Sequence, residues 1–183
     1  MSVTSSLVIG AGQAGLSTAF HLDRLGIEHL VLDANAAAGG AWQHRWDALT
    51  MADVHRVADL PDQALPAAIG PERANEFVPS YFADYESRNT ITVLRPVEVD
   101  SVSDEAGLLR VRAVDGRSWL TRTLVNATGT WGRPFIPHYR GQETFTGRQL
   151  HTVDYPGPAQ FAGKRVLVVG GGASAVQFLG ALR

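Results

Sequence analysis

Cysteine is absent from the 183-residue sequence. This absence excludes disulfide scaffolds, thiolate zinc sites, cysteine nucleophiles and dithiol redox pairs within the chain. Charge is also sparse, because charged residues make up only 19% of the sequence and the net charge is −2. Without a basic field to attract a polyanion, we expect no nucleic-acid partner.

Long hydrophobic runs are missing as well. The most apolar stretch, residues 7–20, is interrupted by glycines and falls short of the roughly 18–20 residues that a membrane span needs. Residues 1–6 lack the Lys or Arg of a signal-peptide leader. We therefore expect no membrane partner and a cytoplasmic location. The histidines show no metal-ligand spacing, so we expect no metal site.

Glycine is plentiful, with 19 residues, and its placement is informative. Gly10-x-Gly12-x-x-Gly15 follows the apolar strand expected at residues 7–9 and opens a helical pattern. This spacing is typical of dinucleotide binding: Gly10 permits the turn, Gly12 admits a pyrophosphate, and Gly15 lets the helix and the strand pack closely. The phosphates would lie at the helix N-terminus, where free N–H groups favour negative charge.

Two features after this turn extend the predicted site. Asp33 ends a second expected strand, residues 29–32, and lies 23 residues after Gly10. An acidic residue about 20 residues after the turn binds the ribose hydroxyls in dinucleotide sites. Gly39-Gly40-Ala41-Trp42 follows, and its small residues would let the backbone lie against a flat ring system that Trp42 covers.

The middle of the chain changes its periodicity. We expect a helix at residues 79–89 and a buried strand at residues 91–94. Residues 97–125 alternate in polarity around turns at 104–107 and at Asp115-Gly116, which predicts an antiparallel ribbon inserted in a parallel fold. A further strand is expected to end at residues 127–129.

A second glycine turn lies near the C-terminus. Residues 165–169 form an apolar run that predicts a strand, and Gly170-x-Gly172-x-x-Ala175 follows directly. Ser174 adds a hydroxyl that could donate to a phosphate. Two such turns in one chain indicate two dinucleotides, as in hydride transfer from a nicotinamide to a flavin.

The order of these motifs resembles that of the flavin-containing monooxygenases and their Baeyer–Villiger and plant auxin-pathway relatives. The most specific element is the string Phe145-x-Gly147-x-x-x-His151-x-x-x-Tyr155-Pro156, which looks like the signature that separates these enzymes from other flavoproteins. By this resemblance the first turn binds FAD and the second binds NADPH, or NADH, in the complete protein. Ala127-Thr128-Gly129 is similar to the linker motif of two-dinucleotide flavoproteins.

The resemblance implies an α/β fold. It consists of a Rossmann-like FAD-binding domain with a parallel sheet and an inserted antiparallel ribbon, followed by the first strand and helix of an incomplete second nucleotide-binding domain. We place the first domain at residues 1–160 and the second at residues 161–183, because a βαβ unit needs about 30 residues. The predicted cofactor-binding residues are Gly10, Gly12, Gln13, Ala14, Gly15, Asp33, Ala34, Gly40, Trp42, Val97, Thr128, Gly129, Gly170, Gly172 and Ser174.

The resemblance also implies a reaction. NAD(P)H would reduce FAD, and O2 would then oxygenate a small organic substrate through a 4a-hydroperoxyflavin. We assign no catalytic side chain, because the flavin carries the chemistry. Two alternatives stay open: a flavin reductase of the disulfide-reductase type, against which the lack of cysteine counts, and an FAD-binding module without catalysis.

The apolar C-terminal strand and helix lead to one more expectation. Without the remaining strands of its domain, this segment would present an unpaired edge and an apolar face. We expect residues from about 164 onward to pack against another copy of the chain, or against the FAD domain in a position foreign to the family. We also expect negligible NADPH affinity for the chain alone.

Overall fold

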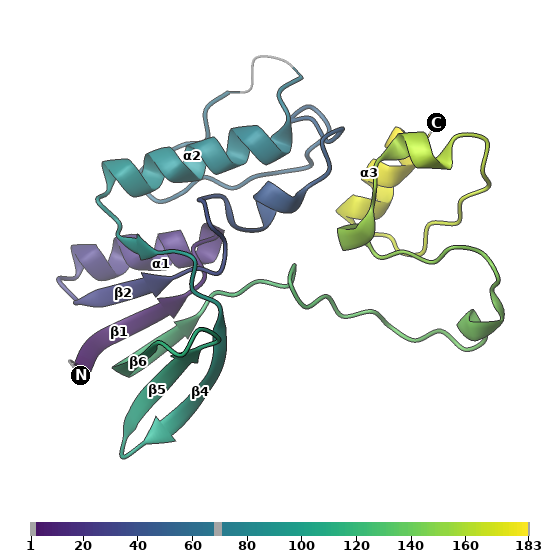
Figure 1. Ribbon diagram of the computed structural model, residues 1–183. Coiled ribbons are helices and arrows are strands. Elements are labelled where there is room, and N and C mark those ends of the chain that lie inside the picture. The colour runs from purple at the N-terminus through teal and green to yellow at the C-terminus, as the bar shows by residue number, and fades with distance from the viewer. Residues whose placement is uncertain (1–2, 68–70, 183) are drawn as a thin grey trace.

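A six-stranded sheet forms the centre of the protein in a computed structural model that describes residues 3–67 and 71–182 (Figure 1). The strand order is β3-β2-β1-β6-β5-β4. The strands are β1 (Val3–Ile9), β2 (His29–Leu32), β3 (Val93–Leu94), β4 (Val99–Glu105), β5 (Leu108–Ala113) and β6 (Ser118–Asn126). β1, β2, β3 and β6 pair in parallel, whereas β4, β5 and β6 pair antiparallel. The predicted α/β class is confirmed, with one refinement: β6 is both the last strand of the ribbon and a central strand of the parallel sheet.

Side chains of β1 alternate between two cores, as the period of a strand requires. Val8 packs with α1 (Gln13–Arg24) and α2 (Ala74–Arg88), which cover one face of the sheet (Figure 1). Leu7 and Ile9 pack on the opposite face with residues of β5. The ribbon therefore covers the face that the helices leave open, and both faces of β1 are buried.

α2 begins earlier than the sequence predicts. From the helical spacing of aromatic residues we expected its start at Pro79, but the helix begins at Ala74 and holds Pro79 in its interior. Ala74 and Val78 are fully buried, and the carbonyl of Arg73 accepts hydrogen bonds from Glu76 and Phe77. Burial of this extra turn outweighs the hydrogen bond that Pro79 cannot donate.

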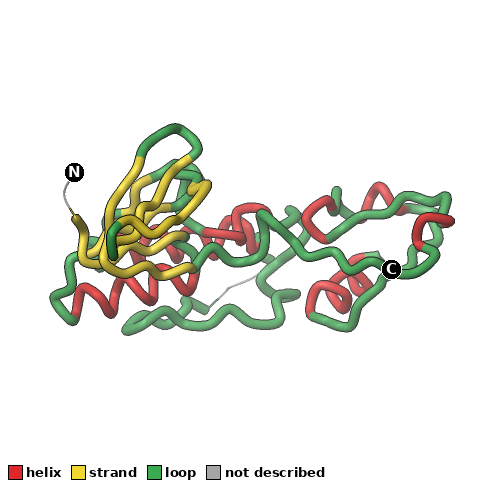
Figure 2. The backbone as a smooth tube through the Cα atoms, turned by 90° about the horizontal axis from the view of Figure 1, so that it is seen from below, coloured by secondary structure: helices red, strands yellow, loops and turns green. Residues whose placement is uncertain are grey.

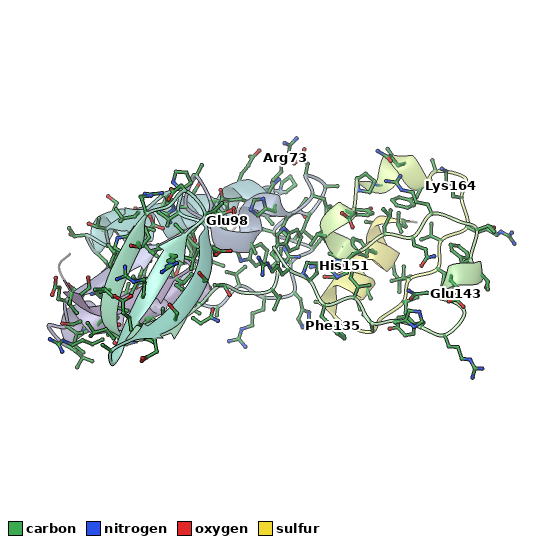
Figure 3. The ribbon with its side chains drawn as sticks, turned by 60° about the horizontal axis from the view of Figure 1, so that its bottom comes forward. Arg73, Glu98, Phe135, Glu143, His151 and Lys164 are labelled. Atoms are coloured by element: carbon green, nitrogen blue, oxygen red, sulfur yellow. The ribbon has the colours of Figure 1, made fainter. Side chains whose placement is uncertain are left out.

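The chain leaves the sheet after β6 and forms a second group of elements, the C-terminal segment (residues 127–182; Figure 2). Figure 3 labels Arg73 and Glu98 in the sheet lobe, which is residues 3–67 and 71–126, and Lys164 in the C-terminal segment. In this view Phe135 and His151 lie between them. The segment contains short 3-10 turns, at Gln142–Thr144, Thr152–Asp154 and Pro158–Phe161, and the helix α3 (Ala173–Ala181). A fourth 3-10 turn, η1 (Gly40–His44), belongs to the sheet lobe, residues 3–67 and 71–126.

The strand predicted at residues 165–169 is wrong for this structure. These residues have no regular secondary structure and pair with no strand among the described residues, and Leu167 is 85% exposed. A strand is held by hydrogen bonds to a neighbour, so an apolar run alone does not form one. The helix predicted after the second turn is confirmed as α3. Among the described residues, no helix is both long and apolar enough to cross a membrane.

Candidate nucleotide-binding site

The first glycine turn is built so that two of its glycines cannot carry a side chain. Gly10 has a φ of 101°, and a Cβ there would collide with the carbonyl of Ala127. A Cβ at Gly15 would collide with the carbonyl of Gly10. The turn thus brings β1, α1 and the end of β6 into backbone contact, which is the close packing that the spacing predicts.

Gly12 differs from Gly10 and Gly15, because a Cβ at this position would meet nothing within 4 Å. Gly12 is also the N-cap of α1, and no side chain caps the helix or places an acid in its first turn. The first-turn N–H groups and the positive end of the helix dipole therefore have no capping side chain, and there is open space where a Gly12 side chain would lie. This arrangement can accept a phosphate group.

Asp33 is only 4% exposed and lies beside the turn. Its Oδ2 accepts a hydrogen bond from the backbone N–H of Ala11 at 2.6 Å, and its Oδ1 accepts two from Asn35 at 2.8 and 2.9 Å. A carboxylate has about four acceptor sites, so roughly one remains for a ribose hydroxyl. The carboxylate is therefore fixed by the protein rather than solvated.

The Gly39-Gly40 turn packs directly on the phosphate turn. Gly40 has a φ of 50°, and a Cβ there would lie 2.9 Å from the Cα of Gly12. On its other side, Gly39 leaves room for the ring of Pro79. Trp42 is half-buried in the following 3-10 turn and contacts the helical core. The structure thus brings Gly40 and Trp42 to the first turn.

Of the other predicted residues, some are exposed near the first turn, whereas the side chain of Gln13 already has hydrogen-bond partners. The linker residues Thr128 and Gly129 follow Ala127, whose carbonyl touches the turn, and Thr128 is exposed. Ala14 and Ala34 are exposed close to Gly12 and Asp33. By contrast, the Nε2 of Gln13 donates to the carbonyls at 58 and 59, at 3.1 and 3.0 Å.

Val97 is buried, and its N–H donates to the carbonyl of Asp33 at 2.7 Å. We expected its backbone to contact an adenine ring. Because the N–H already has a partner, only the Val97 carbonyl is left for that contact.

The second turn reproduces the backbone of the first. Gly170 has a φ of 137°, and Gly172 caps α3 with φ −85° and ψ −179°, close to the −82° and −167° of Gly12. A Cβ at Gly172 would also meet nothing within 4 Å. Ser174 is half-buried in the first turn of α3. A second phosphate-accepting turn is therefore present.

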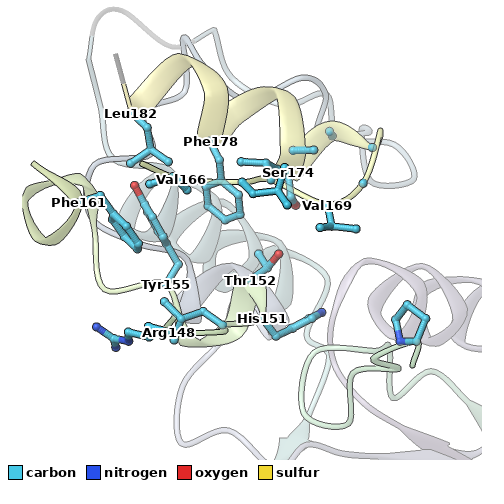
Figure 4. Close-up of a pocket in the computed structure, with 18 of the residues that line it drawn as sticks. Arg148, His151, Thr152, Tyr155, Phe161, Val166, Val169, Ser174, Phe178 and Leu182 are labelled. Carbon is cyan, nitrogen blue, oxygen red and sulfur yellow. The ribbon is translucent and has the colours of Figure 1, made fainter. Parts of the chain in front are cut away.

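Two cavities adjoin this second turn. One, of about 440 Å³, lies inside the C-terminal segment, and its lining includes Tyr155, Val166, Ser174 and Phe178 (Figure 4). The other, of about 750 Å³, lies between residues 46–55 of the sheet lobe and α3. The larger cavity is lined by Gly171 and Gly172 of the second turn and by residues of the sheet lobe, so a ligand in it would contact both.

The signature string lies in the C-terminal segment, and its Tyr155 contacts the sheet lobe. The ring of Phe145 folds over Gly147, where a Cβ would collide with it. His151 caps a 3-10 turn by accepting from the N–H of Val153 at 3.3 Å. Tyr155 packs on Trp46 of the sheet lobe, with ring centroids 5.3 Å apart. Its hydroxyl is buried without a partner, and burial raises the pKa of Tyr155.

One cluster at the site was missed by sequence reasoning. The guanidinium of Arg45 lies over the rings of Trp131 and Trp42, at 4.4 and 5.4 Å from their centroids. His44 stacks on Trp131 and bonds through Nε2 to the Oδ1 of Asn35 at 2.7 Å. Trp131 is 86 residues from Arg45 in the sequence, and no periodic pattern links them.

Comparison of the sequence and the structure with known proteins identifies the family of this chain. The sequence profile described as "Pyridine nucleotide-disulphide oxidoreductase" matches residues 7–180. Indole-3-pyruvate monooxygenase YUCCA1 of Oryza sativa subsp. japonica is 31% identical over 178 residues, covering 96% of this chain and 44% of that protein. The structure of a flavin-containing monooxygenase from Stenotrophomonas maltophilia is 44% identical with a TM-score of 0.91, covering 100% of this chain and 55% of that one. A bacillithiol disulfide reductase from Staphylococcus aureus is 22% identical with a TM-score of 0.60, covering 72% of this chain and 40% of that one.

These matches bear on the C-terminal segment. The alignment with the Stenotrophomonas structure includes the whole chain, so the segment lies in the arrangement seen in that flavin monooxygenase. The expected position foreign to the family is therefore wrong, although α3 does contact the sheet lobe through Phe178 and Trp46, with ring centroids 5.0 Å apart. The chain spans about half the length of the relatives that it matches.

Proposed function

This chain belongs to the pyridine nucleotide-disulphide oxidoreductase family, as one of its flavin-containing monooxygenases, and we propose that it binds FAD at the first glycine turn. The observation that carries this proposal is the open space in front of Gly12, at an uncapped helix N-terminus beside a buried Asp33. An open phosphate position beside a fixed carboxylate fits a dinucleotide.

The protein's part in the chemistry is to bind and orient. The N–H groups of the first turn of α1 hold the pyrophosphate, and the remaining acceptor site of Asp33 takes a ribose hydroxyl. The Gly39-Gly40 turn packs against Gly12, and Trp42 follows it in contact with the helical core. FAD supplies hydride acceptance and oxygen activation when bound.

The second turn is the proposed position of the nicotinamide cofactor, NADPH or NADH. Gly170, Gly172 and Ser174 would contact its phosphates, since their backbone repeats that of the first turn. We propose that the complete protein is an NAD(P)H-dependent monooxygenase that uses O2 to oxygenate a small organic substrate. The domain boundary at residue 160 stays a prediction.

The test compares substitutions at Gly12 and Gly172, the two glycines that cap α1 and α3. Gly12→Val and Gly172→Val each place a side chain in space that the protein leaves empty, so both variants should fold. We expect Gly12→Val to lose FAD, because the valine occupies the phosphate position, and Gly172→Val to retain it. FAD affinity is measured by titration of flavin fluorescence, with circular dichroism as the check on folding.

The companion measurement is anaerobic NADPH addition to the FAD-loaded chain, followed by the flavin absorption. Bleaching supports the monooxygenase reading, whereas bound flavin that NADPH leaves oxidised indicates an FAD-binding module. The unpaired residues 165–169 favour that second candidate for the chain alone. A folded Gly12→Val variant that binds FAD like the wild type would overturn the assigned phosphate site.

A further inference from the structure

Arg45 carries a positive charge that no carboxylate in the described chain neutralises. Six ion pairs occur among residues 3–67 and 71–182, and none includes Arg45. Its Nε is enclosed and lacks a hydrogen-bond partner, and burial lowers the pKa of Arg45. A half-buried cation whose enclosed Nε has no hydrogen-bond partner costs free energy, so its retention here calls for a reason.

The two tryptophans fix Arg45 without using its donors. A cation–π contact engages the positive charge, whereas the five N–H donors of a guanidinium lie in its plane. The rings of Trp42 and Trp131 hold this plane from two separate segments of the chain. His44 in turn holds Trp131 by stacking at an interplanar angle of 14°. The guanidinium is thus pre-organised with donors to spare.

Both tryptophans extend from backbone that touches the first glycine turn. Trp42 follows Gly40, whose Cβ position lies 2.9 Å from the Cα of Gly12. Trp131 comes four residues after Ala127, whose carbonyl lies against Gly10. The Arg45 cluster is therefore built on two segments that both touch the turn of the proposed cofactor site.

We propose that Arg45 binds an oxyanion, a phosphate or a carboxylate, that reaches the region beside the first glycine turn. A planar guanidinium pairs with such groups through two parallel hydrogen bonds, and in a partly enclosed position these bonds are strong. The inference rests on the proposed function only for the source of the anion. A cofactor phosphate and the carboxylate of an acidic substrate present the same chemistry to Arg45.

The experiment titrates the cofactor-free chain with inorganic pyrophosphate and with benzoate, followed by tryptophan fluorescence. Neutral benzamide is the control for benzoate. Arg45→Gln removes the charge, and Arg122→Gln, at an exposed position on β6, is the matched control. We expect at least one anion to bind the wild type and to bind Arg45→Gln at least tenfold more weakly, with Arg122→Gln unchanged.

FAD titration of the same variants identifies the source. A tenfold loss of FAD affinity in Arg45→Gln assigns the site to a cofactor phosphate. Unchanged FAD affinity with lost benzoate binding assigns it to a substrate carboxylate. Should the wild type bind an anion but no FAD, the proposed function fails while the role of Arg45 stands.

Arg45→Lys guards against a variant that does not fold, because it keeps the charge and loses only the planar fork. We expect it to bind the anion several-fold more weakly than the wild type. The proposal is overturned if neither anion binds the wild type, if benzamide binds as well as benzoate, or if both folded Arg45 variants retain full anion affinity.

Discussion

The turns at Gly10 and Gly170 share a backbone conformation but differ in how tightly the rest of the protein packs around them. Both open with a glycine at positive φ, and both helices are capped by a glycine in an extended conformation. Gly10 lies between β1, α1 and β6, whereas the nearest atom to a Cβ at Gly170 would be the Cβ of Ala175 at 4.0 Å. Local sequence therefore suffices to form the turn, and only the sheet makes it rigid.

The largest difference is expected from replacing the first glycine of each turn with alanine. Gly10→Ala combines positive φ with a backbone collision and should cost about 3 kcal/mol or more, with loss of FAD binding. Gly170→Ala meets only the conformational penalty and should cost about 1–2 kcal/mol. Urea unfolding followed by tryptophan fluorescence gives both values. Equal costs would show that the two turns are equally constrained.

Helix α1, after the first turn, and residues 165–169, before the second, should respond differently to the loss of an apolar side chain. Leu16 in α1 is fully buried, so Leu16→Ala should cost about 2–5 kcal/mol. Leu167 is 85% exposed, and Leu167→Ala should change stability by less than about 0.5 kcal/mol. The same unfolding experiment measures both. A large cost at Leu167 would mean that another chain covers it, which is also the expected self-association.

Two tyrosines with buried hydroxyls, Tyr85 and Tyr155, give a smaller contrast. Tyr85 donates to the carbonyl of Pro61 at 3.0 Å, whereas the hydroxyl of Tyr155 has no partner. Tyr85→Phe should therefore cost about 1 kcal/mol. Tyr155→Phe should leave stability unchanged or raise it, because it removes an unpaired polar atom. Thermal unfolding of the two variants tests this, and a larger loss for Tyr155→Phe would reverse the assignment.

Tyr85 also predicts a pH dependence for the sheet lobe. Burial raises the pKa of Tyr85 from its ordinary 10.0 to about 12, so the folded state favours the protonated form. The stabilisation is complete below about pH 10 and is lost as the pH rises through about 12. Tyr85→Phe should weaken this alkaline loss of stability, which unfolding at a series of pH values would detect.

The sequence by itself determined the parts of the protein that depend on near neighbours. The two glycine turns, the helices that follow them and the hairpin at Asp115-Gly116 were all predicted, because backbone conformation and turn chemistry act over a few residues. The burial of both faces of β1 also follows from its apolar run.

Only the tertiary structure decided the features that need a distant partner. Residues 165–169 have the composition of a strand, but no strand in the described part of the chain pairs with them. Helix α2 begins before Pro79 because Ala74 is buried against Trp46 and Leu49. Arg45 and Trp131 meet because β6 ends beside the first glycine turn and delivers the linker to η1. Hydrogen-bond pairing and burial join residues that are far apart in sequence, so no local pattern specifies them.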